Sequence, residues 1–256
     1  MNGLVTLLSD FGTQDGYVGA MKGVLFREHP AVRVVDLSHE VPAQDVVAGA
    51  FALAQAAPWF PPGTIHVAVV DPTVGTGRRA LVIEAGGSIF IGPDNGLLTL
   101  AARLDGAGTA TWAIDRVPES WSVHPTFHGR DLFARVAARL AAGAEVREFA
   151  RCPVDPVRLA VPRPERRGDH WHGVVVHVDR FGNLITNLPA DTVGEGLVEV
   201  EGVSAPRVST YGQVERGQLL ACPSSSGHLE IAIRDGSAAA TLHARRGARV
   251  RASARP

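Results

Sequence analysis

The chain has 256 residues, enough for one large domain or two unequal ones, and its formal net charge is −1. Nucleic-acid-binding modules usually carry a large basic excess to neutralise phosphates, so this charge argues against that class and favours a small-molecule partner. Two cysteines, Cys152 and Cys222, lie far apart and form neither a disulfide framework nor a metal-knuckle spacing. With no run of eighteen apolar residues and no cationic leader before an apolar core, we expect a soluble cytoplasmic protein that does not enter a membrane.

The first part of the chain alternates apolar strands with amphipathic helices. Four predicted strands end at an aspartate, at residues 4–10, 32–36, 65–71 and 89–94. Helices are expected between and after them, at residues 17–29, 44–56, 97–104 and 131–142. Continuous apolar runs indicate strands that are covered on both faces. We therefore predict an α/β domain over residues 1–160, with a largely parallel sheet, flanking helices and four acids at one sheet edge.

The composition changes at residues 151–168, where prolines crowd among charged residues and predict a linker. The segments beyond it are short and β-like, at residues 174–178, 197–200, 229–233 and 239–244. No long helical period interrupts them, so residues 168–256 are predicted to form a smaller antiparallel β-barrel domain. The Arg-rich end, residues 245–255, is interpreted as a solvated terminus.

The stretch at residues 69–79, VVDPTVGTGRR, places Asp71 at the end of a buried strand, where open α/β sheets bind ligands. Its glycines permit a tight turn that brings Arg78 or Arg79 within reach of Asp71. The spelling also fits the dinucleotide pattern G-x-G-x-x-A. That fingerprint must open a helix, whereas residues 80–84 predict a strand, so we reject a dinucleotide site.

Asp10 follows the first predicted strand, where a carboxylate can accept both hydroxyls of a ribose. Helix capping is the alternative, but Asp15 is better placed to cap the helix that begins near residue 17. In the turn at residues 93–96, Asp94 and Asn95 either cap the next helix or contact the substrate, and both interpretations stay open.

Histidines do not show a metal-binding pattern. His124 and His128 are four residues apart, but Pro125 and Gly129 break the helical geometry that such a pair needs, so His128 is interpreted as a lone polar or catalytic imidazole. A second group alternates along a strand without a carboxylate or thiol at metal-ligand spacing, and we interpret it as strand-edge residues: His170, His172 and His177. No metal site is predicted.

Asp179 and Asn183 lie in a polar turn that interrupts a β stretch. A carboxylate binds an ammonium group and an amide can contact a carboxylate, so the pair suits the polar end of an amino acid. A plain hairpin turn is the alternative.

Six stretches that run nearly end to end resemble the S-adenosyl-L-methionine (SAM) hydroxide adenosyltransferase family, which is related to the fluorinase and chlorinase enzymes. They are SDFGTQDGYVGAMKGV at 9–24, VVDPTVGTGRR at 69–79, IGPDNGLL at 91–98, FHGRD at 127–131, VDRFGNLITNL at 178–188 and SSSGHLEIAIRDGSAA at 224–239. The chain departs from the family pattern at Thr73, where glycine is usual.

The resemblance implies hydrolysis of SAM to adenosine and L-methionine, with SAM as substrate and with no cofactor or metal. It implies a homotrimer with each site between the N-domain of one subunit and the C-domain of the next. Asp71, Arg78 and His128 would be the catalytic residues, and Asp10 would hold the ribose diol. The residues implied for the methionine portion are Asp179, Asn183 and either Ser225 or Ser226.

The chemistry is consistent with these residue types. A sulfonium makes the thioether a good neutral leaving group, so the enzyme must place an oxygen nucleophile in line with the C5′–S bond and exclude other water. Arg78 cannot act as a base at neutral pH and is assigned to orienting the water, while Asp71 or His128 takes the proton.

The residues leave three alternatives to hydrolysis of SAM. Halide alkylation is disfavoured because an anionic Asp71 would repel a halide. A metal-dependent phosphohydrolase built on Asp10, Asp71 and Asp94 would lose turnover in EDTA. A non-catalytic SAM or nucleoside sensor would bind tightly without turnover.

Overall fold

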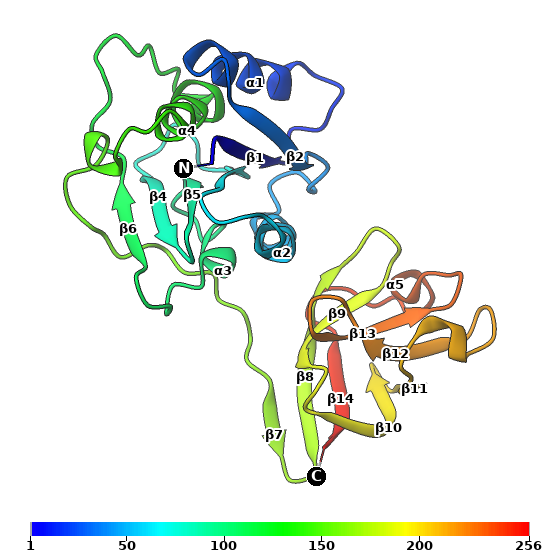
Figure 1. Ribbon diagram of the computed structural model, residues 1–256. Coiled ribbons are helices and arrows are strands. Elements are labelled where there is room, and N and C mark those ends of the chain that lie inside the picture. The colour runs from blue at the N-terminus through cyan, green and yellow to red at the C-terminus, as the bar shows by residue number, and fades with distance from the viewer. Residues whose placement is uncertain (1, 256) are drawn as a thin grey trace. The chain divides into compact units, whose positions relative to one another are not determined.

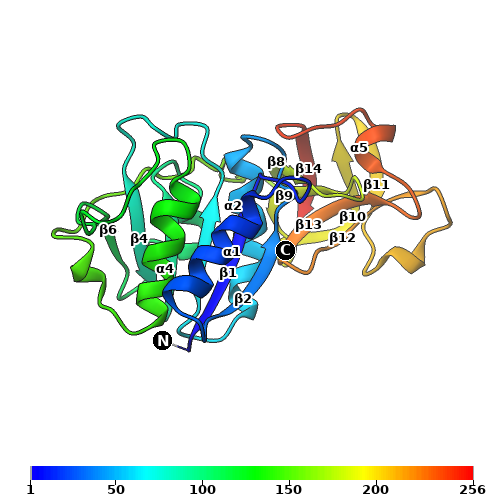
Figure 2. The same ribbon diagram turned by 90° about the horizontal axis from the view of Figure 1, so that it is seen from above.

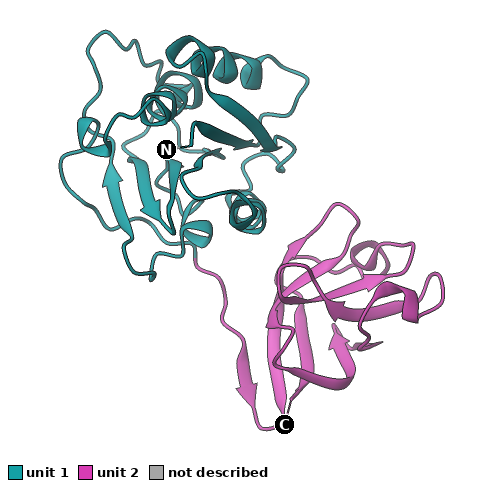
Figure 3. Cartoon of the chain, in the orientation of Figure 1, with its two compact units in different colours: residues 1–159 teal, residues 160–256 magenta. Residues whose placement is uncertain are grey.

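The structure is a computed structural model that describes residues 2–255, and the chain divides between residues 159 and 160 into two compact units (Figure 3). Among the described residues, unit 1 contains a six-stranded sheet in the order β2-β1-β3-β5-β4-β6. The strands are β1 (Leu4–Ser9), β2 (Arg33–Ser38), β3 (Ile65–Val69), β4 (Ala80–Ala85), β5 (Ser88–Pro93) and β6 (Ala110–Ala113). β2, β1, β3 and β5 run parallel, whereas β4 and β6 are antiparallel. The prediction of a largely parallel sheet is confirmed.

Helices cover both faces of this sheet (Figures 1 and 2). α1 (Tyr17–Glu28) and α4 (Ala134–Ala141) share one core with Leu7, and α2 (Val46–Ala56) and α3 (Thr99–Ala102) share the other with Leu8. Because successive residues of a strand point to opposite faces, Leu7 and Leu8 enter different cores. Covering on both sides explains why the strands are continuous apolar runs. Short turns complete the unit: η1 (Ala57–Trp59), the π-helical η2 (Gly129–Phe133) and η3 (Val146–Glu148).

Three of the four predicted acids lie at the carboxyl edge of the parallel strands, since Asp10, Asp71 and Asp94 directly or closely follow β1, β3 and β5. Asp36 lies inside β2, where it pairs with Leu7, and the strand continues to Ser38. The prediction that this strand ends at its aspartate is therefore wrong.

Unit 2 is an antiparallel, nearly closed barrel-like sheet in the order β11-β10-β14-β8-β9-β13-β12, with β7 paired to β8. The strands are β7 (Glu165–Arg167), β8 (His170–Val178), β9 (Leu184–Pro189), β10 (Val193–Val200), β11 (Val203–Pro206), β12 (Leu219–Pro223), β13 (His228–Ile233) and β14 (Arg249–Ala254). The backbone N–H of Val208 donates to the carbonyl of Ala221 at 2.8 Å and joins the segment after β11 to β12. The prediction of a small antiparallel barrel is confirmed.

The Arg-rich end is not a solvated terminus, so that prediction is wrong. Residues 249–254 form β14, which lies between β10 and β8 in the sheet. Val250 and Ala252 are buried in the core, while the arginines that alternate with them are exposed. This two-residue period is that of a strand with one buried face. The exposed arginines made this core strand look like a polar terminus in the sequence.

The predicted β segment at residues 239–244 is also wrong, since α5 (Ala238–Thr241) occupies its start. The hydroxyl of Ser237 accepts a hydrogen bond from the backbone N–H of Ala240 at 3.1 Å. A serine N-cap before a run of alanines starts a helical turn, because alanine has the highest helix propensity.

None of the helices within residues 2–255 is both long enough and apolar enough to span a membrane.

Candidate active site

Asp71, Arg78 and His128 form one connected cluster at the carboxyl edge of the unit 1 sheet. Nε of Arg78 lies 3.0 Å from each carboxylate oxygen of Asp71, and Nη2 donates to Oδ2 of the same group. Nη2 also lies 2.9 Å from Nδ1 of His128. The side chains of Arg78 and Asp71 are only 7% and 5% exposed, so water screens this ion pair weakly. The structure thus brings the three predicted catalytic residues together.

The loop between β3 and β4 delivers Arg78, rather than Arg79, to Asp71. Gly75 has a φ of +80°, and a Cβ added there would lie 3.2 Å from the carbonyl oxygen of Pro125. Glycine therefore lets this loop approach the loop that carries His128. Arg79 turns away and contacts Asp94, with Nε 2.6 Å from Oδ2. The sequence left this choice of arginine open, and the structure decides it.

The hydrogen bond to Arg78 determines which nitrogen of His128 carries the proton. A guanidinium donates only, so Nδ1 must be the acceptor and a neutral His128 is protonated on Nε2. Burial lowers the pKa of His128, and Arg78 lowers it further, while Asp71 and Asp131 act in the opposite direction. At neutral pH the ring is uncharged. The buried ring of Phe133 packs against the His128 ring, with centroids 6.4 Å apart, and lies 5.6 Å from Cζ of Arg78.

His128 is followed by the π-helical turn η2, a type of irregularity that occurs frequently at functional sites. Asp131 in this turn is buried and accepts from both Nε and Nη2 of Arg130, at 2.7 and 2.8 Å. Asp131 also accepts from the backbone N–H of His124 at 3.0 Å, which ties the preceding loop to the turn. Asp131 was not predicted as a site residue, although it lies in the motif FHGRD that carries the family resemblance.

Asp10 does not cap α1. Its Oδ2 accepts from the backbone N–H of Gln44 at 2.8 Å, and Gln44 has a φ of 65°. The N-cap of α1 is Gly16, and no side chain caps this helix, so the assignment of Asp15 as its cap is wrong. Asp10 accepts no other hydrogen bond from residues 2–255 and keeps acceptor capacity for a ligand.

A pocket of about 460 Å³ adjoins the turn that carries Asp10. Its aromatic walls are Phe11, Tyr17 and Phe127, and the Phe127 ring meets the other two nearly edge-on at centroid distances of 5.8 and 5.4 Å. Cζ of Arg130 lies 4.8 Å from the Phe127 centroid. The pocket combines apolar surface with a cation next to the predicted site residues. None of these aromatic residues was predicted as a site residue, although each lies within a stretch that carries the family resemblance.

Asp94 and Asn95 are engaged by their own unit. Oδ1 of Asp94 accepts from the backbone N–H of Val157 at 2.7 Å, and its other oxygen binds Arg79. Nδ2 of Asn95 donates to the carbonyl of Val70 at 2.8 Å, and Oδ1 accepts from the backbone N–H of Leu97 at 3.2 Å. These contacts favour the turn interpretation, and substrate contact by either residue stays a prediction.

Asp179 organises the turn between β8 and β9 in unit 2. Its Oδ1 accepts from the backbone N–H groups of Phe181 and Asn183 at 2.9 and 2.8 Å, and Oδ2 accepts from Nδ2 of Asn183 at 3.0 Å. Gly182 is required here, because an added Cβ would lie 2.0 Å from Oγ of Ser237. The two predicted polar residues therefore form one rigid unit.

Ser225 and Ser226 lie at the opposite end of β9 from this turn. They belong to the hairpin between β12 and β13, whose residue His228 pairs with Pro189, the last residue of β9. Asn183 precedes the first residue of the same strand. The bridges at the two ends of β9, Leu184↔Ile231 and Pro189↔His228, lie three residues apart on β13, roughly 10 Å at about 3.3 Å per residue. The four residues predicted for methionine are thus two separate pairs.

The sequence analysis missed Glu230 and Tyr211, which lie near Asp179. The Tyr211 hydroxyl donates to the buried carboxyl group of Glu230. Burial raises the pKa of Glu230; the hydrogen bond from Tyr211 lowers it in part, and the negative charge of Asp179 raises it again. A glutamate inside the apolar strand LEIAI was the available signal.

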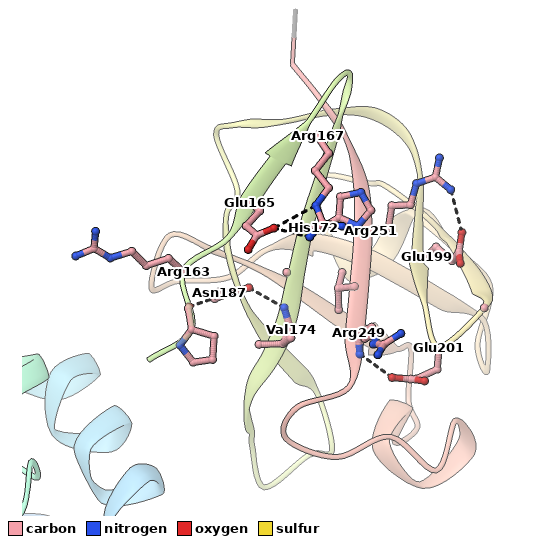
Figure 4. Close-up of a pocket in the computed structure, with 14 residues that line it drawn as sticks. Arg163, Glu165, Arg167, His172, Val174, Asn187, Glu199, Glu201, Arg249 and Arg251 are labelled. Carbon is pink, nitrogen blue, oxygen red and sulfur yellow. Dashed lines mark hydrogen bonds and ion pairs between the residues drawn. The ribbon is translucent and has the colours of Figure 1, made fainter. Parts of the chain in front are cut away.

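A groove of about 770 Å³ on unit 2 contains none of the predicted site residues among those that line it (Figure 4). Its charges are matched by exposed neighbours: Nη2 of Arg167 lies 2.6 Å from Glu165 on the same strand, and Nη1 of Arg251 on β14 lies 3.8 Å from Glu199, its partner on β10. Exposed ion pairs of this kind are typical of a solvated sheet face.

No cluster of three or more metal-ligating side chains occurs within the part of the chain that the structure describes. The guanidinium groups of Arg78 and Arg79 lie against the carboxylates of Asp71 and Asp94, where a cation of a phosphohydrolase would otherwise bind.

Comparison with known proteins agrees with this geometry. Residues 5–150 match the model of the SAM hydroxide adenosyltransferase N-terminal domain, and residues 173–251 match that of the C-terminal domain. A protein named (R)-S-adenosyl-L-methionine hydrolase from Salinispora tropica is 42% identical over 98% of this chain and 97% of its own length. A protein of the same name from Thermus thermophilus is 42% identical over 96% of this chain and 98% of its own length.

A solved structure of an uncharacterized conserved protein from Thermotoga maritima superposes with a TM-score of 0.87 at 32% identity, covering 96% of this chain and 98% of that one. Two domain models cover most of the chain, and two relatives align over nearly their full lengths. The chain belongs to the SAM hydroxide adenosyltransferase family.

Proposed function

We propose that this protein hydrolyses S-adenosyl-L-methionine to adenosine and L-methionine by in-line attack of water at C5′. The observation that carries the proposal is the arrangement of Arg78, which is bound on one side by Asp71 and on the other by His128. Its support from comparison is the name of two relatives that are 42% identical over nearly the whole chain.

The leaving group needs no protonation, because cleavage of the C5′–S bond converts a sulfonium into a neutral thioether. The protein therefore has to hold water in line with that bond, and positioning alone contributes on the order of 7–11 kcal/mol in well-oriented reactions. Arg78 is fixed by Nε and Nη2, which contact Asp71 and His128. Nη1 contacts the carbonyl of Arg79 at 3.4 Å and has a second N–H that can face the water.

Water loses one proton as its oxygen bonds to C5′, and we assign Asp71 as the acceptor. Nδ1 of His128 is occupied by Arg78, and Nε2 already carries a proton in the neutral ring. His128 can therefore donate to the water oxygen but cannot take its proton. Oδ2 of Asp71 accepts from both Nε and Nη2 of Arg78, so the proton is assigned to Oδ1. Oδ1 accepts from Nε of Arg78 at 3.0 Å and from the Thr73 hydroxyl at 3.4 Å, and the water replaces this longer contact.

Substrate contacts are proposed on both units. Asp10 holds the ribose diol with the acceptor capacity that its contact with Gln44 leaves. Asp179 with Asn183, and Ser225 with Ser226, are proposed to contact opposite ends of the substrate, with one pair on the amino-acid group. Their positions at the two ends of β9 support this division.

We propose a homotrimer in which the N-domain of one subunit and the C-domain of the next share each site. The supporting feature is that the catalytic cluster lies in unit 1, whereas the residues suited to an amino acid lie in unit 2. The proposed domains are residues 1–160 and 168–256. We further propose that the enzyme works in the cytoplasm and that SAM is its substrate, with no cofactor or metal.

Incubation of the purified protein with SAM in ¹⁸O-water tests the reaction. Mass spectrometry is expected to find adenosine with one solvent oxygen at C5′, together with methionine. Adenine or S-adenosylhomocysteine as product would contradict the proposal, because these arise from glycosidic cleavage or methyl transfer. Repeating the reaction in EDTA tests the metal-dependent alternative, and tight binding without turnover would indicate a sensor.

A further inference from the structure

A chain of polar contacts runs beneath the turn that carries Asp10, outside the catalytic cluster. Ser9, the last residue of β1, is completely buried, and its Oγ lies 2.7 Å from Nδ1 of His39. Nε2 of His39 lies 3.1 Å from Oδ1 of Asp36, within the distance of an ion pair. The two atoms are not aligned as a hydrogen bond requires. Nζ of Lys22 lies 2.5 Å from the other oxygen of Asp36. The chain leads from a buried serine to a surface lysine.

These are the residue types of a hydrolytic triad, but the serine cannot be a nucleophile. Ser9 has no exposed surface, and its Oγ also accepts from the backbone N–H of Phe11 at 3.3 Å. A nucleophile must reach the substrate, which a fully buried hydroxyl cannot do. The contacts of Ser9 instead hold the turn that begins at this residue.

The segment after β2 holds this turn at two further points. The carbonyl of His39 accepts from the backbone N–H of Gly12 at 2.8 Å. The backbone N–H of Gln44 donates to Asp10, and it does so from a left-handed conformation that non-glycine residues rarely adopt. Ser9, Asp10 and Gly12 are therefore all attached to residues 39–44.

We propose that His39 is a positioning residue for the ribose-binding carboxylate. By holding Ser9 with its side chain and Gly12 with its carbonyl, His39 fixes both ends of the turn in which Asp10 lies. Asp10 is then in place before the nucleoside arrives, so less ordering accompanies binding. This inference rests on the proposed function, because it takes Asp10 as the ligand of the ribose diol.

Substitutions at His39 and Ser9 separate the two contacts of the imidazole. Ser9→Ala and His39→Ala remove the Ser9 contact, and each is expected to raise the adenosine Kd about tenfold, as loss of one buried hydrogen bond does. The KM for SAM should rise in parallel, with kcat within about twofold of the parent. His39→Asn can place a polar atom near the position of Nδ1 and should restore most of the affinity, although it no longer reaches Asp36. Unchanged adenosine affinity in both alanine variants would overturn the inference.

The same sheet offers a matched control. Oγ1 of Thr6 lies 2.8 Å from Nδ1 of His66, and both residues are completely buried on β1 and β3. Thr6→Val removes a hydroxyl–imidazole contact like that of Ser9 with His39, but away from the turn. It should therefore lower the stability of the protein and leave the affinity for adenosine unchanged. If Thr6→Val weakens adenosine binding as much as Ser9→Ala, general destabilisation explains both, and the inference is wrong.

Asp10→Ala, with the adenosine Kd of every variant measured by calorimetry, distinguishes failure of this inference from failure of the proposed site. Unchanged adenosine affinity in Asp10→Ala removes the ribose assignment itself, and with it the inference, whereas the ¹⁸O experiment still stands. If Asp10→Ala weakens binding, Ser9→Ala should add nothing in that background, because both act through one carboxylate. Additive effects would mean that Ser9 and His39 act elsewhere, and only the positioning inference would be lost.

Discussion

Nη2 of Arg78 donates to Nδ1 of His128 across 2.9 Å, and this contact makes the histidine an unsuitable base. The accepting nitrogen is occupied, and the other nitrogen of a neutral ring carries a proton. We therefore propose that the catalytic roles divide: Asp71 takes the proton, Arg78 orients the water, and His128 holds Arg78 and donates to the water.

His128→Asn tests this division. An asparagine oxygen can occupy the place of Nδ1 and accept from Arg78, but it cannot act as a base at neutral pH. We expect kcat to fall no more than about tenfold in His128→Asn and further in His128→Ala, which leaves Arg78 without this partner. Steady-state kinetics with SAM measures both. Equal, severe losses in the two variants would show that the imidazole is the base.

The pH dependence of kcat gives an independent measurement. Burial and then Arg78 lower the pKa of His128, so its protonation belongs below the ordinary value of about 6.5. Protonated His128 cannot accept from Arg78, and the cluster should lose activity as pH falls through that lowered pKa. We expect a kcat plateau above pH 6.5, with an acidic limb below it that changes in His128→Asn. A limb centred above 6.5 would contradict this assignment.

Arg78 and Arg79 are a matched pair, because adjacent residues of one type face different acids. Arg78→Lys keeps the charge but loses the planar fork that contacts Asp71 and His128 together, so we expect kcat to fall at least about a hundredfold with KM little changed. Arg79→Lys loses the bridge from Asp94 to the carbonyl of Asp155 and should mainly lower the unfolding temperature. Steady-state kinetics and thermal unfolding of both variants test these two expectations. Near-normal kcat in Arg78→Lys would refute the positioning role.

Local patterns were sufficient to predict the parallel sheet and its acidic edge. Apolar runs that end in aspartate identify a strand and its carboxyl end, and parallel strands share that edge. Local patterns suggested Asp71, one of two arginines and His128, and the family resemblance combined Asp71, Arg78 and His128 as the predicted catalytic residues. The orientation of Arg79 toward Asp94 was not predictable, because it depends on the conformation of a loop with several flexible positions.

Unit 2 was predicted less well, since its organisation depends on pairing between distant strands. The arginines near the C-terminus look like a solvated tail until β14 is seen between β10 and β8, where Val250 enters the core. Likewise, nothing local places Ser225 and Asn183 at opposite ends of β9. Strand register, which separates them, is set by partners along the whole barrel.

A buried histidine should make the stability of unit 1 depend on pH. Burial lowers the pKa of His66 from 6.5 to about 4. Between these values the unfolded chain binds a proton that the folded chain does not, so the unfolding free energy falls as pH decreases from 6.5 to 4, by up to about 3 kcal/mol. Denaturant titrations at pH 7 and 4.5 measure this. His66→Leu should flatten that part of the profile, and an unchanged slope would contradict it.

The two polar pairs of unit 2 are expected to recognise different parts of the substrate. Asp179 and Asn183 lie beyond one end of β9, and Ser225 and Ser226 lie beyond the other. The bridges at these two ends, Leu184↔Ile231 and Pro189↔His228, are three residues apart on β13, roughly 10 Å, so the two pairs do not lie side by side. Asp179→Asn and the double change Ser225→Ala with Ser226→Ala should therefore weaken the binding of different products. Inhibition constants for methionine and for adenosine, measured against SAM turnover, give the two affinities separately. One variant should raise the constant for methionine by about fivefold or more, as loss of hydrogen bonds to a charged group does, while the other spares methionine. If both variants weaken methionine binding to the same extent, the residues at the two ends of β9 contact one group. The division proposed from the strand register would then be wrong.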